Sequence, residues 1–309
     1  MALDLTWLRT WVEVVDAGGF ARAAELVHLS QPRVSAHISN LEKELGYSLI
    51  ERRLRPLTLT EEGKALLPRA RAVLAAADEL TAGVAKDGII SGNVKVASFV
   101  SASSEFLPAV ISQLAQDHPQ IDISIYDGDV GVIDAALSER RVAVALRPMR
   151  PEPRERDFTV RPLWREPFVV VVPEGHPLLA DEIIDPSQLS GERIITIGNP
   201  LQEAVLGSEA EGAFSSISRQ LPGGSVSHQP STLGAMVRAG QGIGVMNYLA
   251  FATIRHDGLE YRELSLDHYR DVGVWWHSER PLSTAARAFI SAVVAAPRPY
   301  GTWETPSPR

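Results

Sequence analysis

The sequence contains no cysteine, which excludes disulfides, thiolate zinc sites, thiol nucleophiles and thiol redox sensing. Long apolar runs are missing too. The longest clear one, Phe168 to Val172, falls far short of the roughly 20 residues that a membrane-spanning helix needs. No basic stretch leads into an apolar one near the N-terminus, so no signal peptide is expected. We therefore expect a cytoplasmic protein with no membrane partner.

The motifs of common enzymes are absent as well. There is no Walker lysine motif and no His-Glu-X-X-His. The glycine-rich run 240–244 follows a helical pattern and enters a strand pattern, which is the reverse of the order that dinucleotide binding requires. The run 223–227 departs from a nucleophile elbow at its last position, and the histidines form no i, i+4 pair with a nearby carboxylate. The sequence thus predicts no catalytic residue, no metal site and no cofactor.

What is present is a chain of 309 residues with an ordinary composition, 45% hydrophobic and 22% charged, enough for about two domains. The net charge is −8, but residues 1–60 hold seven basic and seven acidic residues, so the acidic excess lies further along. Arg52, Arg53 and Arg55 fall within four positions. Such a local basic cluster matters more for nucleic-acid binding than the total charge.

The first 60 residues carry the pattern of three short helices. The first is expected to end at Gly18-Gly19 and the second at about Leu26. The third begins after a Ser30 N-cap and runs to about Leu45, where Gly46 is a good stop. An apolar stripe should bury this third helix on one side, through Val34, Ile38, Leu41 and Leu45.

The opposite face of the third helix is small and polar at its N-terminal half, as a helix entering a DNA major groove requires. Pro32 and Ala36 lie opposite the stripe, with Arg33 and His37 on its flank. Two short extended runs, 49–50 and 57–59, then enclose the basic turn and predict a β-wing that reaches DNA. The alternative is a helical subdomain with a solvated arginine loop, since helix-turn-helix shapes also occur without DNA.

Four segments, 20–26, 29–35, 38–46 and 57–63, resemble the winged helix-turn-helix of LysR-type transcriptional regulators. The resemblance implies that Gln31, Pro32, Arg33 and Ser35 face base edges and that Arg53 makes the wing contact. One departure is Ala36, where the family often has arginine, and the Arg33 charge offers a replacement. The full set of candidate DNA-binding residues is Ser30, Gln31, Pro32, Arg33, Ser35, His37, Arg52 and Arg53.

A long helix should follow, capped by Thr60 and kinked at Pro68. Its apolar residues alternate spacings of four and three, at Leu66, Ala70, Val73, Ala77, Leu80 and Val84. One interpretation is an amphipathic helix that lies on its own domain. We favour a dimerisation helix, because pairing places two recognition helices on successive half-sites about 34 Å apart, as the resemblance also implies.

From Val94 onward, strand patterns alternate with helical ones, which is typical of an α/β domain. Strands are expected at 94–98, 121–126, 142–146, 168–172, 193–197, 244–246 and 271–276, and helices at about 104–116, 233–239 and 283–295. This layout resembles the effector-binding region of the same family, similar to periplasmic solute-binding proteins. The resemblance implies two α/β subdomains, with the chain crossing near residues 163–165 and returning near 266–268.

The expected fold class is therefore an α+β multidomain protein. A winged helix-turn-helix spans 1–60 and a linker helix 61–90. A two-subdomain α/β effector region of the periplasmic-binding-protein type spans 91–296, with subdomain I at about 91–163 and 268–296 and subdomain II at about 164–267. The proline-rich tail 297–309 is expected to be disordered.

Strand ends at a subdomain crevice are where α/β folds bind small ligands. Ser101 matches the family position that most often binds effector. Exposed N–H groups and hydroxyls around residues 98–104 suit a carboxylate or other anion, which Arg147 could pair. The candidate effector residues are Ser98, Ser101, Ser103, Arg147, Gly198, Asn199 and Thr232. The alternative is that these serines merely cap helices and turns.

We expect a bacterial regulator, dimeric or tetrameric, that binds double-stranded promoter DNA on the nucleoid and responds to a small-molecule effector. An activator would also contact RNA polymerase. Two alternatives remain open: a ligand-independent DNA-architectural protein whose C-terminal region serves only oligomerisation, and an enzyme with a DNA-binding head, since convergent catalytic sites can lack motifs.

Overall fold

The computed structural model describes residues 3–51, 56–82, 89–153, 157–198, 224–227, 229–266, 269–279 and 281–305. The chain divides into two compact units, one of residues 1–90 with 139–141 and one of residues 91–138 with 142–309. No described helix is both long enough and apolar enough to pass through a lipid bilayer.

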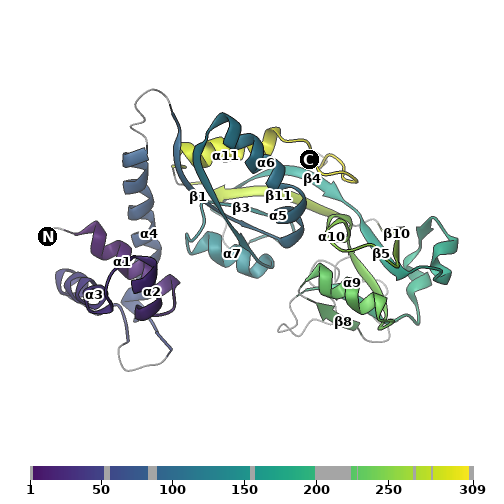
Figure 1. Ribbon diagram of the computed structural model, residues 1–309, viewed down its shortest axis with the longest axis horizontal. Coiled ribbons are helices and arrows are strands. Elements are labelled where there is room, and N and C mark those ends of the chain that lie inside the picture. The colour runs from purple at the N-terminus through teal and green to yellow at the C-terminus, as the bar shows by residue number, and fades with distance from the viewer. Residues whose placement is uncertain are drawn as a thin grey trace. The chain divides into compact units, whose positions relative to one another are not determined.

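The N-terminal unit begins with the three expected helices, α1 (Leu5–Asp16), α2 (Phe20–Leu26) and α3 (Gln31–Leu45) (Figure 1). The Asp4 side chain caps α1 by accepting the Thr6 N–H at 2.7 Å. Ser30 occupies the N-cap position of α3, although its side chain makes no capping hydrogen bond. Gly46 ends α3 with a φ of 83°, a left-handed conformation that glycine adopts without strain.

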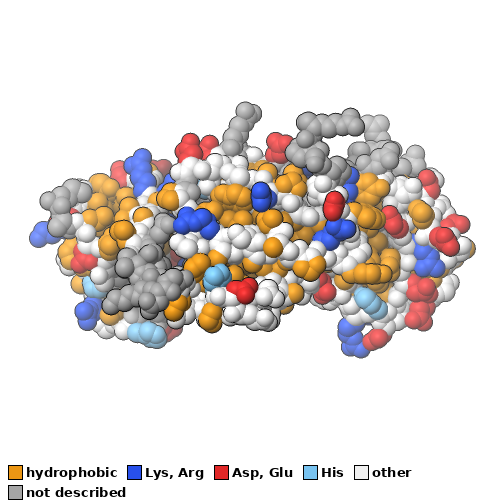
Figure 2. Space-filling model, turned by 90° about the horizontal axis from the view of Figure 1, so that it is seen from above, with side chains coloured by type: hydrophobic (Ala, Val, Ile, Leu, Met, Phe, Trp, Pro, Cys, Tyr) orange, Lys and Arg blue, Asp and Glu red, His pale blue; other side chains and the backbone are white. Residues whose placement is uncertain are grey.

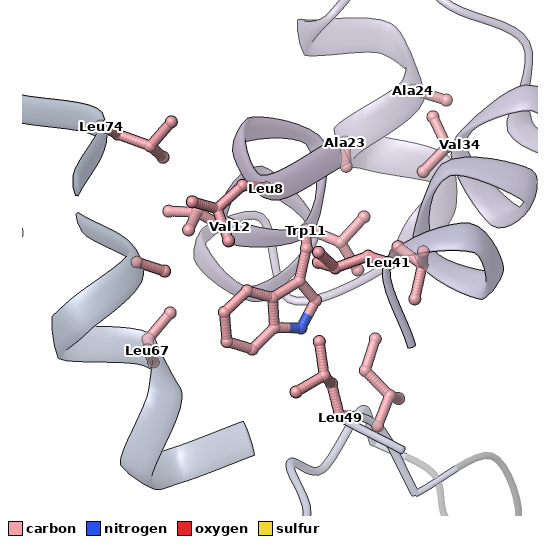
Figure 3. Close-up of a cluster of buried hydrophobic side chains, with 14 residues drawn as sticks. Leu8, Trp11, Val12, Ala23, Ala24, Val34, Leu41, Leu49, Leu67 and Leu74 are labelled. Carbon is pink, nitrogen blue, oxygen red and sulfur yellow. The ribbon is translucent and has the colours of Figure 1, made fainter. Parts of the chain in front are cut away.

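Trp11 lies at the centre of the core that joins these helices (Figure 3). It is fully buried, and Val34, Ile38 and Leu41 from α3 are buried with it, as the stripe predicted. Leu49 adds a contact from the start of the wing. A buried tryptophan of this size contributes several kcal/mol, about 3–5 on truncation to alanine, so it fixes how α3 is turned.

The wing forms next to this core, where Ile50 and Leu59 make an antiparallel bridge. The Glu51 N–H donates to the Thr58 carbonyl at 2.9 Å, and the Thr60 N–H donates to the Leu49 carbonyl at 3.1 Å. The basic turn at its tip, including Arg52 and Arg53, lies outside the described residues.

The long helix α4 (Glu61–Ala82) runs unbroken through Pro68, and Thr60 caps it by accepting the Gly63 N–H at 2.9 Å. The predicted seam does not stay on one side of the helix. Ala70 is buried in the Trp11 core together with Leu67 and Leu74, which the prediction did not include, whereas Val73 and Leu80 are 43% and 77% exposed. Val84 lies outside the described residues. The helix thus packs on its own domain along one side and leaves apolar residues in solvent along another.

The C-terminal unit contains two mixed sheets. The first has the strand order β2-β1-β3-β11-β4, from β1 (Ser91–Ser98), β2 (Gln120–Asp127), β3 (Val144–Pro148), β4 (Phe158–Glu166) and β11 (Arg270–His277). Strands β1, β2 and β3 are parallel, and β11 runs antiparallel to both β3 and β4. Helices α6 (Leu107–Asp117) and α11 (Thr284–Ala295) cover one face and α7 (Val130–Ser138) the other (Figure 1).

The second sheet has the order β6-β10-β5-β9-β7-β8. Its strands are β5 (Phe168–Pro173), β6 (Ile183–Ile184), β7 (Ile194–Ile197), β8 (Gly224–Ser227), β9 (Ile243–Asn247) and β10 (Leu259–Leu264). Helices α9 (Pro230–Arg238) and α10 (Tyr248–Ala252) pack against it, together with short 3-10 turns η2 (Pro177–Ala180) and η3 (Pro186–Leu189). The apolar run that the sequence singled out, Phe168 to Val172, is the buried strand β5 at the centre of the sheet.

The chain passes between the two sheets twice. It leaves the first sheet at Glu166, the end of β4, and enters the second at Phe168, the start of β5. It returns between Leu264, the end of β10, and Arg270, the start of β11. The family resemblance implied crossings near residues 163–165 and 266–268, which are close to these positions.

The C-terminal segment differs from the expectation of disorder, because residues 297–305 are ordered. Trp303 and Arg165 exchange two backbone hydrogen bonds of 2.8 Å, which extends the edge of the first sheet. The Thr302 hydroxyl donates to the Pro299 carbonyl at 2.6 Å and stiffens the turn. Gly301 packs against Tyr248 of α10, which belongs to the second sheet's layer, so the segment touches both subdomains.

Replacing Gly63 by alanine tests the packing of the wing on α4. A Cβ at this position would lie 2.3 Å from the Leu49 carbonyl oxygen, so the backbone must shift. We expect Gly63→Ala to lower the free energy of unfolding by about 1–3 kcal/mol in urea titrations. Gly19→Ser is the control, because no atom lies within 4 Å of a Cβ there, and it should cost nothing. Equal urea midpoints for Gly63→Ala and the wild type would contradict this packing.

Gly301→Val tests the docking of the C-terminal segment. Gly301 has a φ of 72°, and a Cβ would lie 2.2 Å from Tyr248 Cε1. We expect faster hydrogen exchange at the Arg165 amide, whose partner is Trp303. Gly258→Val is a matched control, since Gly258 has the same φ of 72° with no neighbour within 4 Å. Unchanged Arg165 exchange in Gly301→Val would show that the segment stays docked.

Candidate DNA-binding surface and effector site

The N-terminal end of α3 is the exposed surface that the sequence predicted. Gln31, Pro32 and Arg33 are all exposed, and Ala36 is exposed one turn later. Ser35 is half-buried beside them, and Ser30 is exposed at the cap. Because Val34 is fully buried against the core, the helix cannot rotate to hide this end. The structure therefore brings six of the eight candidate DNA-binding residues onto one helix, and Arg52 and Arg53 lie outside the described residues.

His37 is half-buried and held by a neighbour on α1. Its Nδ1 lies 2.9 Å from the Thr10 hydroxyl oxygen, and the Thr10 hydroxyl donates its hydrogen to the Thr6 carbonyl at 2.8 Å. Since that hydroxyl has one hydrogen, Nδ1 must be the donor to Thr10. The neutral ring then carries its proton on Nδ1 and has an acceptor at Nε2. An acceptor suits the amino group of adenine or cytosine and not a phosphate.

A carboxylate lies close to His37. The backbone N–H of Thr6 lowers the pKa of Asp4, and the His37 charge makes a smaller contribution in the same direction.

The serines predicted for the effector site lie in three different settings. Ser98 ends β1 and is fully buried. Ser101 lies on α5 (Val100–Glu105) and is 3% exposed. Ser103 is half-buried, and its hydroxyl donates to the Asp127 carboxylate at the end of β2. Ser103 is therefore engaged with its own sheet, whereas Ser98 and Ser101 lie in the interior.

Arg147 is fully buried and already paired with a carboxylate. Its Nε lies 2.8 Å from Asp134 Oδ1 on α7, and another guanidinium nitrogen donates to the Pro151 carbonyl at 2.6 Å. The guanidinium also lies over the Trp275 ring, 5.0 Å from its centroid. Burial raises the pKa of the Asp134 carboxyl, against the opposing effect of the Arg147 charge. Arg147 thus holds α7 on the sheet and does not meet Ser101 among the described contacts.

A second buried ion pair lies beside Ser101, and the sequence reasoning missed it. Arg270 Nε is 2.8 Å from Glu166 Oε1, with side-chain exposures of 7% and 0%. Another Arg270 nitrogen is 3.4 Å from the Ser101 hydroxyl, and the guanidinium lies 4.4 Å from the Phe99 ring centroid. The available signal was a charged residue, Glu166, two positions before the apolar run that starts at Phe168.

In the second subdomain, Gly198 follows β7 and is half-buried, and Thr232 lies exposed in the first turn of α9. Asn199 lies outside the described residues. Asn247 ends β9 and is 4% exposed, and its amide nitrogen has no hydrogen-bond partner among the residues that the structure describes. Within the described ranges, no group of three or more His, Asp or Glu side chains could hold a metal ion.

The excess of acidic residues does not form a continuous patch on the face shown in Figure 2. Acidic and basic side chains lie interspersed there among apolar and neutral ones. The negative net charge therefore does not by itself oppose a local DNA-binding surface.

Comparison with known proteins agrees with both halves of this description. A family model described as "Bacterial regulatory helix-turn-helix protein, lysR family" matches residues 5–64, and one described as "LysR substrate binding domain" matches residues 88–298. The chain belongs to the LysR family of transcriptional regulators. It is accordingly a DNA-binding regulator with an effector-binding domain, in a family whose members form oligomers.

Relatives of this LysR-type regulator match along nearly the whole chain. The regulator YvbU of Bacillus subtilis, itself uncharacterised, is 28% identical over 297 residues, covering 93% of this chain and 97% of the relative. OxyR of Escherichia coli is 26% identical over 303 residues, 94% of each chain. A full-length OxyR variant from Pseudomonas aeruginosa has a similar fold, with a TM-score of 0.72 at 24% identity and coverage of 96% and 99%.

Thr10→Val tests the proton position on His37. The change keeps the side-chain shape but removes the oxygen that accepts from Nδ1. In the wild type, at a pH where the ring is neutral, we expect imidazole nitrogen shifts in NMR spectra to report a proton on Nδ1. In Thr10→Val that preference should be lost. The exposed His28 is an internal reference. A wild-type ring protonated mainly on Nε2 would contradict the hydrogen-bond assignment.

Proposed function

We propose that this LysR-type regulator reads its operator with the N-terminal end of α3 and responds to a small molecule bound between the two α/β subdomains. The exposed end at Gln31, Pro32 and Arg33, fixed by the burial of Val34, is the observation that carries the DNA-binding proposal. A helix end of this kind can approach base edges closely, and Arg33 offers the charge and forked donors that guanine accepts.

The proposed assembly is a homodimer or homotetramer. The exposed apolar residues of α4, Val73 and Leu80, favour pairing of this helix with a second copy. Pairing would present two α3 helices to two half-sites of one operator. An activating role would make RNA polymerase a further partner.

The effector region favours a ligand-responsive regulator over a purely architectural protein. The second sheet is joined to the first by two crossings at adjacent strand ends, and such a pair can change its relative orientation when a ligand binds between. Several relatives are hydrogen peroxide-inducible gene activators. This chain has no cysteine, so a response through thiol oxidation is excluded for it.

Footprinting separates the regulator from the architectural alternative. The purified oligomer is incubated with its own upstream DNA, with and without fractions of cell metabolites. A metabolite that changes the protected length or the DNA bend supports effector control. Identical footprints under all conditions favour the architectural protein, and turnover of a metabolite would favour an enzyme.

Arg33→Ala tests the base-reading role of α3. We expect a loss of about 1–3 kcal/mol in binding that is confined to operators with the preferred base pair at one position. Lys43→Ala is the control, since Lys43 is exposed on the same helix ten residues on and should affect all sequences alike or none. Binding is measured across an operator library at constant salt. An equal loss on every sequence would refute a base contact by Arg33.

A further inference from the structure

Arg270, the cation next to Ser101, already pairs with the carboxylate of Glu166. Glu166 is fully buried, and both of its carboxylate oxygens are engaged. Oε1 pairs with Arg270 Nε at 2.8 Å and lies 3.4 Å from the Trp164 indole nitrogen. Oε2 accepts the backbone N–H of Leu249 at 3.0 Å. The side chain thus takes the donors that would otherwise receive the carboxylate of a ligand.

These donors come from both subdomains. Arg270 and Trp164 belong to strands of the first sheet, and Leu249 lies on α10 beside the second. An anionic ligand bound between the subdomains would need donors from both of them. The Glu166 carboxylate already accepts from both, so it occupies the position that the carboxylate of such a ligand would take.

The other buried arginine of the described effector region is neutralised in the same way, since Arg147 pairs with Asp134. In the contacts that the structure describes, each buried guanidinium pairs with one carboxylate, so each of these two pairs carries no net charge. A further anion would enter a neutral, low-dielectric interior without a compensating cation. Displacing Glu166 instead would leave that carboxylate buried without its partner, which costs more than the new contact contributes.

We propose that the effector bound at Ser101 is uncharged where it meets this residue, and that hydroxyl or amide groups rather than a carboxylate make the contact. The inference rests on the effector site proposed above and assigns its ligand class. Ser101 and Asn247 are the polar groups suited to such a molecule. Ser101 is buried with a loose 3.4 Å contact to Arg270, and the buried amide nitrogen of Asn247 lacks a hydrogen-bond partner among the described residues.

The test is chemical rescue of the full-length protein. Glu166→Gly removes the whole side chain and leaves a space close to the size of propionate, beside Arg270 and the Leu249 N–H. We expect this variant to have a lowered Tm that sodium propionate raises by several degrees in a saturable way, at constant ionic strength. Propionamide, the uncharged analogue, should not do so. The wild type should show no saturable rise with propionate or benzoate.

Asp271→Ala is the matched control. It removes the carboxylate that binds Arg165 at 2.6 and 2.7 Å, one residue from the Arg270 pair but with both side chains more than a quarter exposed. Because water already screens that arginine, propionate should give no saturable rise.

Two outcomes would overturn the proposal. One is a wild-type Tm that benzoate or propionate raises saturably, with the rise abolished by Ser101→Ala, because an anion would then bind at Ser101. The other is a folded Glu166→Gly protein that propionate does not rescue. If Glu166→Gly does not fold, the wild-type comparison decides alone, and a saturable rise in Tm with benzoate but not with benzamide would overturn the proposal. DNA binding is measured separately, so its failure would not be confused with a failure here.

Discussion

The burial of one side of α3 is the constraint on which the DNA-binding surface depends. Val34, Ile38 and Leu41 are held against Trp11, and the same core takes Leu49 from the wing and Leu67 from α4. The helix α3, the wing and the helix α4 are thereby positioned by one set of apolar contacts. A change in that core would turn α3 and alter which of its side chains are exposed at its N-terminal end.

The effector region depends on a different constraint, the pairing of buried charge. Its apolar strands can fold with few polar groups inside, yet two arginines are buried and each is matched by a carboxylate. Such pairs add little net stability compared with apolar residues of similar size, but losing one member is costly. These pairs hold elements in position. The Arg147–Asp134 pair fixes α7 on the first sheet. The Glu166–Arg270 pair joins β4 to β11 and also contacts α5 and α10.

Much of the fold could be predicted from sequence where a residue's role is decided by its near neighbours. The stripe from Val34 to Leu41, the stop at Gly46 and the apolar run of β5 are signals of this kind, and each predicted element is present. Strand β4 was not predicted, because it contains Pro162 and has exposed residues along an outer edge. The helix expected at 104–116 is divided at Phe106 into α5 and α6, where Pro108 starts a new first turn.

The candidate sites also differ in whether near or distant residues in the sequence determine them. The exposed end of α3 follows from a helical pattern within 15 residues, so sequence located it. The Glu166–Arg270 pair joins residues 104 positions apart, and no local pattern reports such a partner. The C-terminal segment looked disordered because of its prolines, yet its order comes from Arg165 and Tyr248, both distant in sequence. Local composition could not reveal either partner.

The position of the Glu166–Arg270 pair limits how the two subdomains can move. It lies where β4 ends and β11 begins, next to both crossings between the sheets, and it contacts Ser101 of α5 and the Leu249 N–H of α10. A motion that breaks the pair would leave two buried charges unmatched, whereas a motion about it leaves both satisfied. An effector that shifts the orientation can do so only by its difference in affinity for the two arrangements, so a change that keeps the pair needs a smaller difference than one that breaks it.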